Sequence, residues 1–305
     1  MADEAKTPTV RAAEVFNADE DATVLHEAFK GFGTNENAIT SIFAGRSLEQ
    51  RQAIQEAYKS KFEKDLLDDL RSELSGNYLY ALEGLISDPA DFHAKHIKSI
   101  VSELDVISAA YSGLYKVSLL EDVKANVKGP FAAATVAILE GGHDESVPTP
   151  DKVKKDVDLL VNLTPEQWTP ENNQLMDLFI KNNIFYIFSV LSGFKTATQK
   201  DILEIASTAP LPEFREGFKA IVGSAQDQWA FFADQLYMSM KGIGTCDKKL
   251  IYIIIFRCET DLKNIENTFQ EKYKSSLHNF IRDDTSGDYK NLLIALAGPE
   301  EEAKC

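Results

Sequence analysis

The chain has few cysteines and no long apolar run. Its three cysteines, Cys246, Cys258 and Cys305, are too few for a disulfide framework, and free thiols are typical of a reducing, cytoplasmic compartment. No stretch of about 18 uncharged apolar residues occurs, so no transmembrane helix is expected. The most apolar segment, residues 250–256, is too short to span a bilayer and is predicted to be a buried helix.

Positive charge is scarce as well. The chain has 32 Lys and Arg residues against 48 Asp and Glu residues, for a formal net charge of -16. This balance argues against nucleic acid as a partner, because binding to phosphates needs a basic patch. Anionic membranes should repel the chain for the same reason. Binding to such a membrane would therefore depend on a cation held between the two surfaces.

Catalytic motifs are missing from the sequence. It contains no P-loop and no nucleophile elbow. His93 and His96 are spaced so that one helix face presents both, with Asp91 nearby, which leaves open a metal site or an ordinary solvated face. We favour the solvated face and predict that the protein is not an enzyme.

What the chain does contain is one segment that occurs twice. Residues 30–34 read Lys-Gly-Phe-Gly-Thr, and residues 241–245, 211 positions later, read Lys-Gly-Ile-Gly-Thr. In each copy a carboxylate follows 40 positions after the second glycine, as Glu73 and as Asp284. Chance rarely keeps glycines, an acid and an apolar pattern in register over about 55 residues, so this is an internal repeat.

The repeated residues suggest a chemistry. Two glycines in a five-residue loop permit unusual backbone dihedral angles, which can aim neighbouring carbonyl oxygens at one point. Carbonyl and carboxylate oxygens, without His or Cys, suit a hard and flexible cation, and Ca²⁺ is the first choice. The alternative is a helix C-cap followed by a tight turn. Two copies, each with its own acid, favour the calcium loop.

At these residues the chain resembles the annexin family, whose hallmark is Lys-Gly-x-Gly-Thr with an acidic residue at this distance. The ungapped match covers residues 16–87 and 227–299. The resemblance implies an all-α fold, a curved disc of four repeats with about five helices each. The spacing of apolar residues also predicts helices, since strand-like alternation is absent.

The expected organisation follows this repeat pattern, and the N-terminal tail is expected to be flexible because it is polar. The segments are an N-terminal tail (1–16), repeat one (17–87), a truncated repeat two (88–142), a linker (143–149), a degenerate repeat three (150–224), repeat four (225–299) and a C-terminal tail (300–305).

Repeats two and three lack the calcium pattern. In repeat two the loop and the second helix are missing, and residues 126–129 carry no acid where repeat four has Asp284. In repeat three Trp168 is followed by Thr169 and Pro170 instead of glycine, and no acid lies where one is needed. We therefore expect conventional calcium sites only in repeats one and four.

The resemblance also implies specific site residues. The predicted Ca²⁺ ligands are the backbone oxygens of Phe29, Gly31 and Gly33 with the carboxylate of Glu73, and the backbone oxygens of Met240, Gly242 and Gly244 with the carboxylate of Asp284. Accessory sites are expected at Thr34 with Glu36 and at Thr245 with Asp247, although an acid at a helix N-terminus is also explained by the helix dipole. The expected lipid contacts are Lys30, Phe32, Trp168, Lys241 and Ile243. For the two lysines the alternative is a solvated loop, and for Trp168 it is packing against the loop.

The predicted function is calcium-dependent binding to acidic, phosphatidylserine-like phospholipid membranes, through Ca²⁺ bridges from the loops of repeats one and four on the convex face. The protein is expected to be a cytoplasmic monomer that becomes peripheral on membranes when calcium rises. The alternative is a cytoskeletal or structural assembly protein with reduced membrane binding, and protein partners of that kind stay open.

Overall fold

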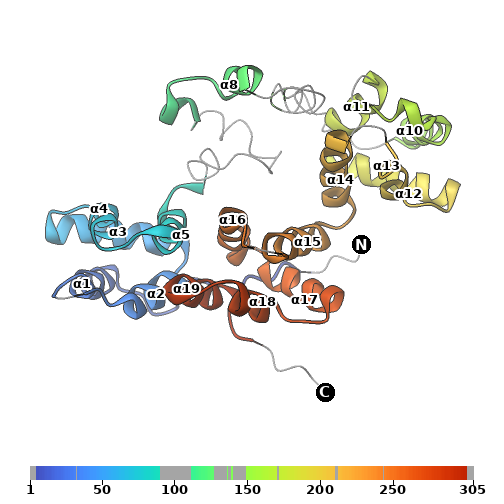
Figure 1. Ribbon diagram of the computed structural model, residues 1–305. Coiled ribbons are helices and arrows are strands. Elements are labelled where there is room, and N and C mark those ends of the chain that lie inside the picture. Colours follow the sequence, from blue (N-terminus) through green and yellow to red (C-terminus); the bar gives the residue numbers. More distant parts are fainter. Residues whose placement is uncertain are drawn as a thin grey trace. The chain divides into compact units, whose positions relative to one another are not determined.

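The computed structural model is all-helical in the part of the chain that it describes, which confirms the predicted fold class (Figure 1). It describes residues 5–31, 33–89, 111–126, 136, 139, 149–169, 172–209, 212–242 and 244–300. No β-strand occurs among them. The chain divides into two compact units, the first made of Met1–Phe92 with Phe232–Cys305 and the second of His93–Phe231.

The first unit contains both copies of the repeated segment. The helices α2, α4 and α5 begin 211 positions before α16, α18 and α19, which is the offset of the sequence repeat. The bounds of the helices are α1 Ala18–Ala28, α2 Glu36–Ala44, α3 Leu48–Phe62, α4 Leu66–Glu73, α5 Gly76–Ile86, α15 Gln228–Met240, α16 Asp247–Cys258, α17 Leu262–Tyr273, α18 Leu277–Asp284 and α19 Gly287–Ala297.

Local sequence determines where these helices begin and end. Ser47 and Gln50 form a capping box at the start of α3, in which each side chain bonds to the other residue's backbone N–H. The helix then ends at Glu63, which adopts the left-handed conformation with φ of 52°. The corresponding residue of repeat four, Lys274, ends α17 in the same way with φ of 57°.

The two repeats of the first unit pack on each other reciprocally. The last helix of repeat four, α19, lies against α2, and the last helix of repeat one, α5, lies against α16 (Figure 1). The contacting helices bury apolar side chains, each of which contributes about 1.5–3 kcal/mol when fully removed from water. Fully buried examples are Ile39, Phe43, Leu82, Ile251, Ile254, Leu293 and Leu296.

The predicted burial of residues 250–256 is confirmed for most of the segment. Leu250, Ile251, Ile253 and Ile254 are buried, and the other three residues are partly buried.

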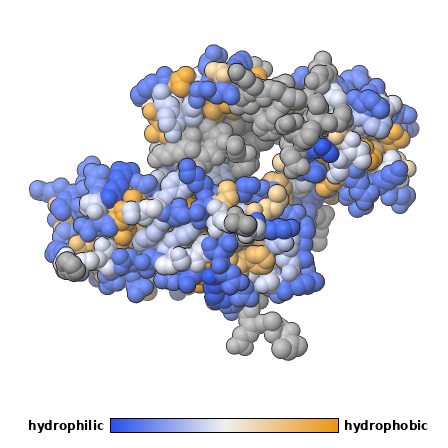
Figure 2. Space-filling model, in the orientation of Figure 1, coloured by the Kyte–Doolittle hydropathy of each residue, from blue (hydrophilic) through white to orange (hydrophobic). Residues whose placement is uncertain are grey.

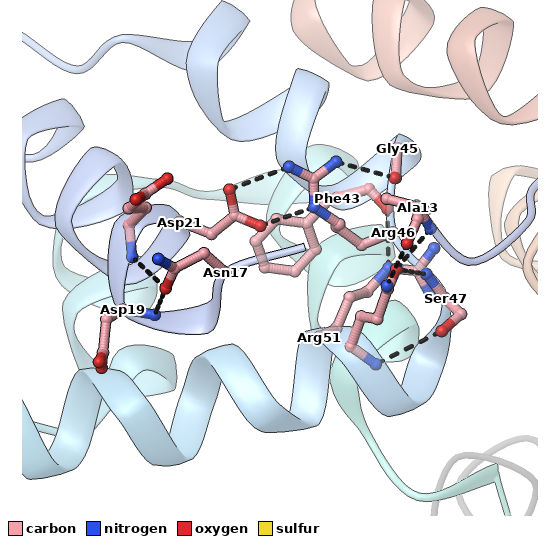
Figure 3. Close-up of polar contacts among 11 residues, drawn as sticks. Ala13, Asn17, Asp19, Asp21, Phe43, Gly45, Arg46, Ser47 and Arg51 are labelled. Atoms are coloured by element: carbon pink, nitrogen blue, oxygen red, sulfur yellow. Dashed lines mark hydrogen bonds and ion pairs between the residues drawn. The ribbon is translucent and has the colours of Figure 1, made fainter. Parts of the chain in front are cut away.

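A buried arginine joins the two repeats. Arg51 on α3 is 2% exposed, and its guanidinium donates to the carbonyl oxygen of Phe43 at 2.7 Å (Figure 3). The same group donates to the carbonyl oxygen of Leu85 at 3.2 Å. It also donates to Glu259 Oε1 at 2.8 Å, while Glu259 Oε2 accepts from the backbone N–H of Leu48. This set of bonds fixes the end of α16 against the start of α3.

A second arginine is held differently in the two repeats. In repeat one Arg46 makes a two-pronged contact to the carboxylate of Asp21, at 2.6 and 3.0 Å (Figure 3). In repeat four Phe232 stands at the place of Asp21, and the corresponding Arg257 lies 4.6 Å above its ring. Arg257 also pairs with Asp261 on its own repeat. Both repeats therefore have the arginine, but its carboxylate partner lies on the first helix in repeat one and after the arginine in repeat four.

The N-terminal segment is not a free tail, so the expectation of flexibility is wrong for residues 7–13. The backbone N–H groups of Thr9 and Val10 both donate to the carbonyl of Cys258, and the Thr9 hydroxyl donates to Leu296 at 2.7 Å. The backbone N–H of Lys263 donates to the carbonyl of Thr7, and Val10 is 4% exposed. The polar composition predicted flexibility, but the backbone groups of a short polar segment can form hydrogen bonds to a folded neighbour.

The second unit has its own core. Its described helices are α8 Leu119–Asn126, α10 Pro150–Asn162, the short 3₁₀ helix η2 Pro165–Gln167, α11 Asn173–Ile180, α12 Ile184–Thr198, α13 Ile202–Ala206 and α14 Pro212–Gln226. The core of α10 to α14 includes Trp168, Val190, Phe194, Phe218 and Val222. Most of the predicted truncated repeat two lies outside the described residues.

The surface of the described residues is largely hydrophilic on the face that Figure 2 shows, as the acidic composition leads one to expect. Within the described part of the chain, none of the helices combines the length and apolar character that crossing a bilayer requires.

Replacing Arg51 should destabilise the first unit strongly. We expect Arg51→Ala to lower the free energy of unfolding by about 2–4 kcal/mol, because it leaves Glu259 without its cation and two carbonyls without donors. The control is Arg71→Ala, which removes an exposed pair with Glu83 and should cost less than about 1 kcal/mol. Urea denaturation measures both, and equal effects would contradict the role given to Arg51.

Candidate functional site in two glycine loops

The two glycine motifs form matching loops. Each loop follows the first helix of its repeat, α1 or α15. The first glycines, Gly31 and Gly242, have φ of 101° and 110°, and the second, Gly33 and Gly244, have φ of 92° and 85°. Residues with a side chain rarely adopt these angles, so the motif needs glycine at both positions.

One backbone hydrogen bond closes each loop. The N–H of Asn35 donates to the carbonyl of Ala28 at 2.9 Å, and the N–H of Cys246 donates to Ser239 at 2.7 Å. These pairs correspond under the 211-residue offset. The loops therefore have the same closure as well as the same dihedral angles.

The carbonyl oxygens of the described loop residues accept no hydrogen bond from another described residue. In the part of the chain that the structure describes, no hydrogen bond goes to the predicted ligand oxygens, which are those of Phe29, Gly31, Gly33, Met240, Gly242 and Gly244. Backbone carbonyls are strong acceptors, and such groups need a solvent or ligand partner. Each loop thus offers oxygen atoms to a cation.

The predicted acids end the fourth helix of each repeat. Glu73 is the last residue of α4 and is exposed, and Asp284 is the last residue of α18 and is partly buried. The hydroxyl of Thr245 lies 2.5 Å from Asp284 Oδ2, which brings this acid directly to its glycine loop. No described hydrogen bond joins Thr34 to Glu73. The sequence motif identifies both Thr245 and Asp284, but it does not predict the hydrogen bond between their side chains.

A tyrosine on the last helix of each repeat, Tyr78 on α5 or Tyr289 on α19, lies near the start of the helix that follows the glycine loop. The Tyr78 hydroxyl donates to the carbonyl of Glu36 at 3.0 Å and lies 2.9 Å from the Thr40 hydroxyl. Burial raises the pKa of Tyr78 to about 12. In repeat four burial raises the pKa of Tyr289, and the nearby carboxylate of Asp247 raises it further. Both tyrosines recur at the repeat offset, which is the signal that marks them in the sequence.

The donor set fits a hard cation. Among the described residues no group of three or more His, Cys, Asp and Glu side chains is placed to hold a metal ion, so the loops would bind chiefly through backbone carbonyls and one carboxylate each. Such an all-oxygen set is typical of Ca²⁺ sites. The alternative histidine pair, His93 and His96, lies outside the described residues.

The two lysines beside the glycines have partners within the protein. Lys30 lies 2.7 Å from Glu27, and both side chains are mostly exposed. This hydrogen bond to Lys30 lowers the pKa of Glu27. Lys241 lies 5.2 Å from the ring centre of Tyr237. The remaining two predicted loop contacts, Phe32 and Ile243, lie outside the described residues.

Trp168 is packed in the core, which corrects its assignment as a lipid contact. It is 1% exposed, and its ring meets Phe218 edge to face with centroids 5.4 Å apart. The capping box of Thr164 and Gln167 turns the chain just before it. Burial of this large ring stabilises the loop of repeat three, so the packed alternative holds.

Comparison with known proteins assigns the family. The sequence model of the annexin family matches residues 20–85 and 231–296, the two stretches that carry the glycine loops. Annexin A4 of Sus scrofa is 34% identical over 317 residues, covering 97% of this chain and 99% of the relative. The chain belongs to the annexin family.

Solved annexin structures share its fold. Annexin III aligns with a TM-score of 0.89 at 29% identity, covering 97% of this annexin and 98% of the other chain. The calcium-bound annexin (Sm)1 aligns with a TM-score of 0.83 at 26% identity, covering 97% and 94%. Annexins in general bind phospholipid in a calcium-dependent manner and are not enzymes.

Replacing a loop glycine should strain the backbone. We expect Gly242→Ala to lower the free energy of unfolding by about 1–3 kcal/mol, because alanine at φ of 110° is unfavourable even with open space around it. The control is Gly223→Ala on α14, where the new methyl group meets only an ordinary contact and helix propensity improves by up to about 1 kcal/mol. Thermal unfolding without calcium compares the two, and equal destabilisation would argue against the strained loop.

The cysteines should differ in reactivity. Cys258 is buried, which raises the pKa of its thiol to about 12, whereas Cys246 beside the second loop is exposed. In a Cys305→Ser variant at pH 8, a thiol reagent should therefore modify Cys246 quickly and Cys258 only after unfolding, because the thiolate is the reacting form. Mass spectrometry of the labelled sites measures this, and rapid labelling of Cys258 in the folded protein would contradict it.

Proposed function

We propose that this annexin binds acidic phospholipid surfaces when calcium is present, with the loops of repeats one and four as the bridging sites. The observation that carries the proposal is the pair of matched loops. Each has two positive-φ glycines, carbonyl oxygens without described donors, and an acid at the end of the fourth helix of its repeat. The same arrangement is kept in both repeats, which supports a binding role for the loops.

Each proposed site uses a small set of oxygens. The first comprises the backbone oxygens of Phe29, Gly31 and Gly33 with the Glu73 carboxylate, and the second those of Met240, Gly242 and Gly244 with the Asp284 carboxylate. A calcium ion bound there would supply positive charge between an acidic protein and a lipid phosphate. The chain's net charge of -16 makes that contribution necessary for contact with an anionic surface.

A single carboxylate with carbonyls implies weak binding without lipid. We expect an affinity toward the weak end of calcium modules, about 10⁻⁴–10⁻³ M. Lipid that prefers the calcium-loaded form tightens calcium binding by the same factor. Two bridging sites on one protein add avidity, although less than four would.

The loop neighbours take supporting roles in the proposal. Lys30 and Lys241, with Phe32 and Ile243 at the loop tips, would contact head groups or the lipid interface. Accessory sites are proposed at Thr34 with Glu36 and at Thr245 with Asp247, and each of these acids lies near a tyrosine of its own repeat, Tyr78 or Tyr289. We expect the protein to be cytoplasmic and to move to membranes when calcium rises.

The decisive variant removes both acids. Glu73→Ala/Asp284→Ala should abolish calcium-dependent co-sedimentation with phosphatidylserine vesicles, because each site loses its only carboxylate. The control is Glu49→Ala/Glu271→Ala, which removes two exposed acids from the same repeats and leaves the loops intact. It should pellet like the wild type.

Failure of the wild type to pellet at millimolar calcium would overturn the proposal. That result would favour the alternative, a cytoskeletal or structural assembly protein. Pelleting of the double variant at unchanged calcium would instead show that membrane binding uses other residues.

A further inference from the structure

The two loops differ in how their acid is held. In repeat four the Thr245 hydroxyl lies 2.5 Å from Asp284 Oδ2 and 3.0 Å from the Asp284 carbonyl oxygen. A hydroxyl has one hydrogen, so the two acceptors share it. The bond links the last residue of the glycine motif to the end of α18, which is 39 positions away in the sequence.

Repeat one lacks this link. Its corresponding pair is Thr34 and Glu73, and no hydrogen bond joins them in the described part of the chain. The Glu73 side chain is exposed and makes no hydrogen bond or ion pair to a described residue. Glutamate is also one methylene longer than aspartate, so it has more side-chain freedom to lose when it is fixed.

We infer that Thr245 is a positioning residue that holds Asp284 at its loop before calcium binds, so that the site of repeat four fills at lower calcium than the site of repeat one. The inference rests on the proposed calcium sites. A ligand group that is already in place loses little conformational entropy on binding, whereas one that must be ordered weakens the affinity by that cost.

The hydrogen bond leaves Asp284 able to coordinate an ion. A carboxylate offers about four acceptor positions, and the hydroxyl occupies one of them. Asp284 also lies near the buried Tyr289 hydroxyl, where its charge contributes to raising the pKa of that tyrosine. The acid is thus restrained from the loop side and placed close to α19, and its remaining oxygen lone pairs stay available.

Single-site variants test the role of the hydroxyl. In a Glu73→Ala background, which leaves only the site of repeat four, Thr245→Val should weaken calcium binding about five- to tenfold, as expected for loss of one ordinary intramolecular hydrogen bond. Thr245→Ser retains the hydroxyl and should bind nearly as well as the parent. Equilibrium dialysis with calcium alone, without lipid, measures the affinity, and thermal unfolding without calcium shows whether each variant is folded.

The matched control uses the other repeat. In an Asp284→Ala background, Thr34→Val should weaken calcium binding clearly less than Thr245→Val does in its own background, because no described bond joins Thr34 to Glu73. Equal losses from Thr34→Val and Thr245→Val, or no loss from Thr245→Val, would overturn the inference while leaving calcium binding itself intact. Absence of calcium binding by the wild type would overturn the proposed function as well.

A second measurement needs no substitution. In a calcium titration of the wild type followed by NMR, the amide signals of Gly242 and Gly244 should shift at lower calcium than those of Gly31 and Gly33. Simultaneous shifts, or the reverse order, would contradict the inference even if Thr245→Val failed to fold.

Discussion

The first unit depends on the reciprocal packing of its two repeats. α19 lies on α2 while α5 lies on α16, so each repeat covers the apolar face that the other would expose to water. Because α2 and α16 directly follow the glycine loops, this core also fixes the exit of both loops on one compact body. The loops can then remain open and unpaired, since their stability comes from the helices on either side.

Polar contacts within the two repeats have diverged, while the packing of the repeats on each other has been kept. Arg46 pairs with Asp21, whereas the corresponding Arg257 lies on the ring of Phe232 and pairs with Asp261. The loops show the same behaviour on a smaller scale, with equal backbone angles but different side-chain bonds to the acid. Backbone geometry is the stricter constraint, because the carbonyls of the proposed cation sites must point to one place whereas a side-chain partner can be exchanged.

Features that repeat or that depend on local chemistry could be predicted from the sequence. The paired glycine loops, the all-α class, the capping box at Ser47 and the buried segment 250–256 belong to this group. Features that depend on contacts between residues far apart in the sequence could not be predicted in this way. The binding of Thr9 to Cys258, the burial of Trp168 and the bond of Thr245 to Asp284 each depend on which surface meets the residue in the folded chain, which periodicity does not encode.

The division of the first unit between two distant stretches affects how the chain acquires its structure during translation. Met1–Phe92 leaves the ribosome first, yet its partner helices belong to Phe232–Cys305, and the whole second unit is made in between. The apolar faces of α2 and α5 therefore stay exposed until synthesis reaches α16 and α19. Long-range contacts that form this late slow folding, and they leave a nascent segment whose exposed apolar surface is prone to aggregation. This chain would therefore benefit from a chaperone that shields the early helices. A chain built from consecutive, self-contained domains would need such a chaperone less.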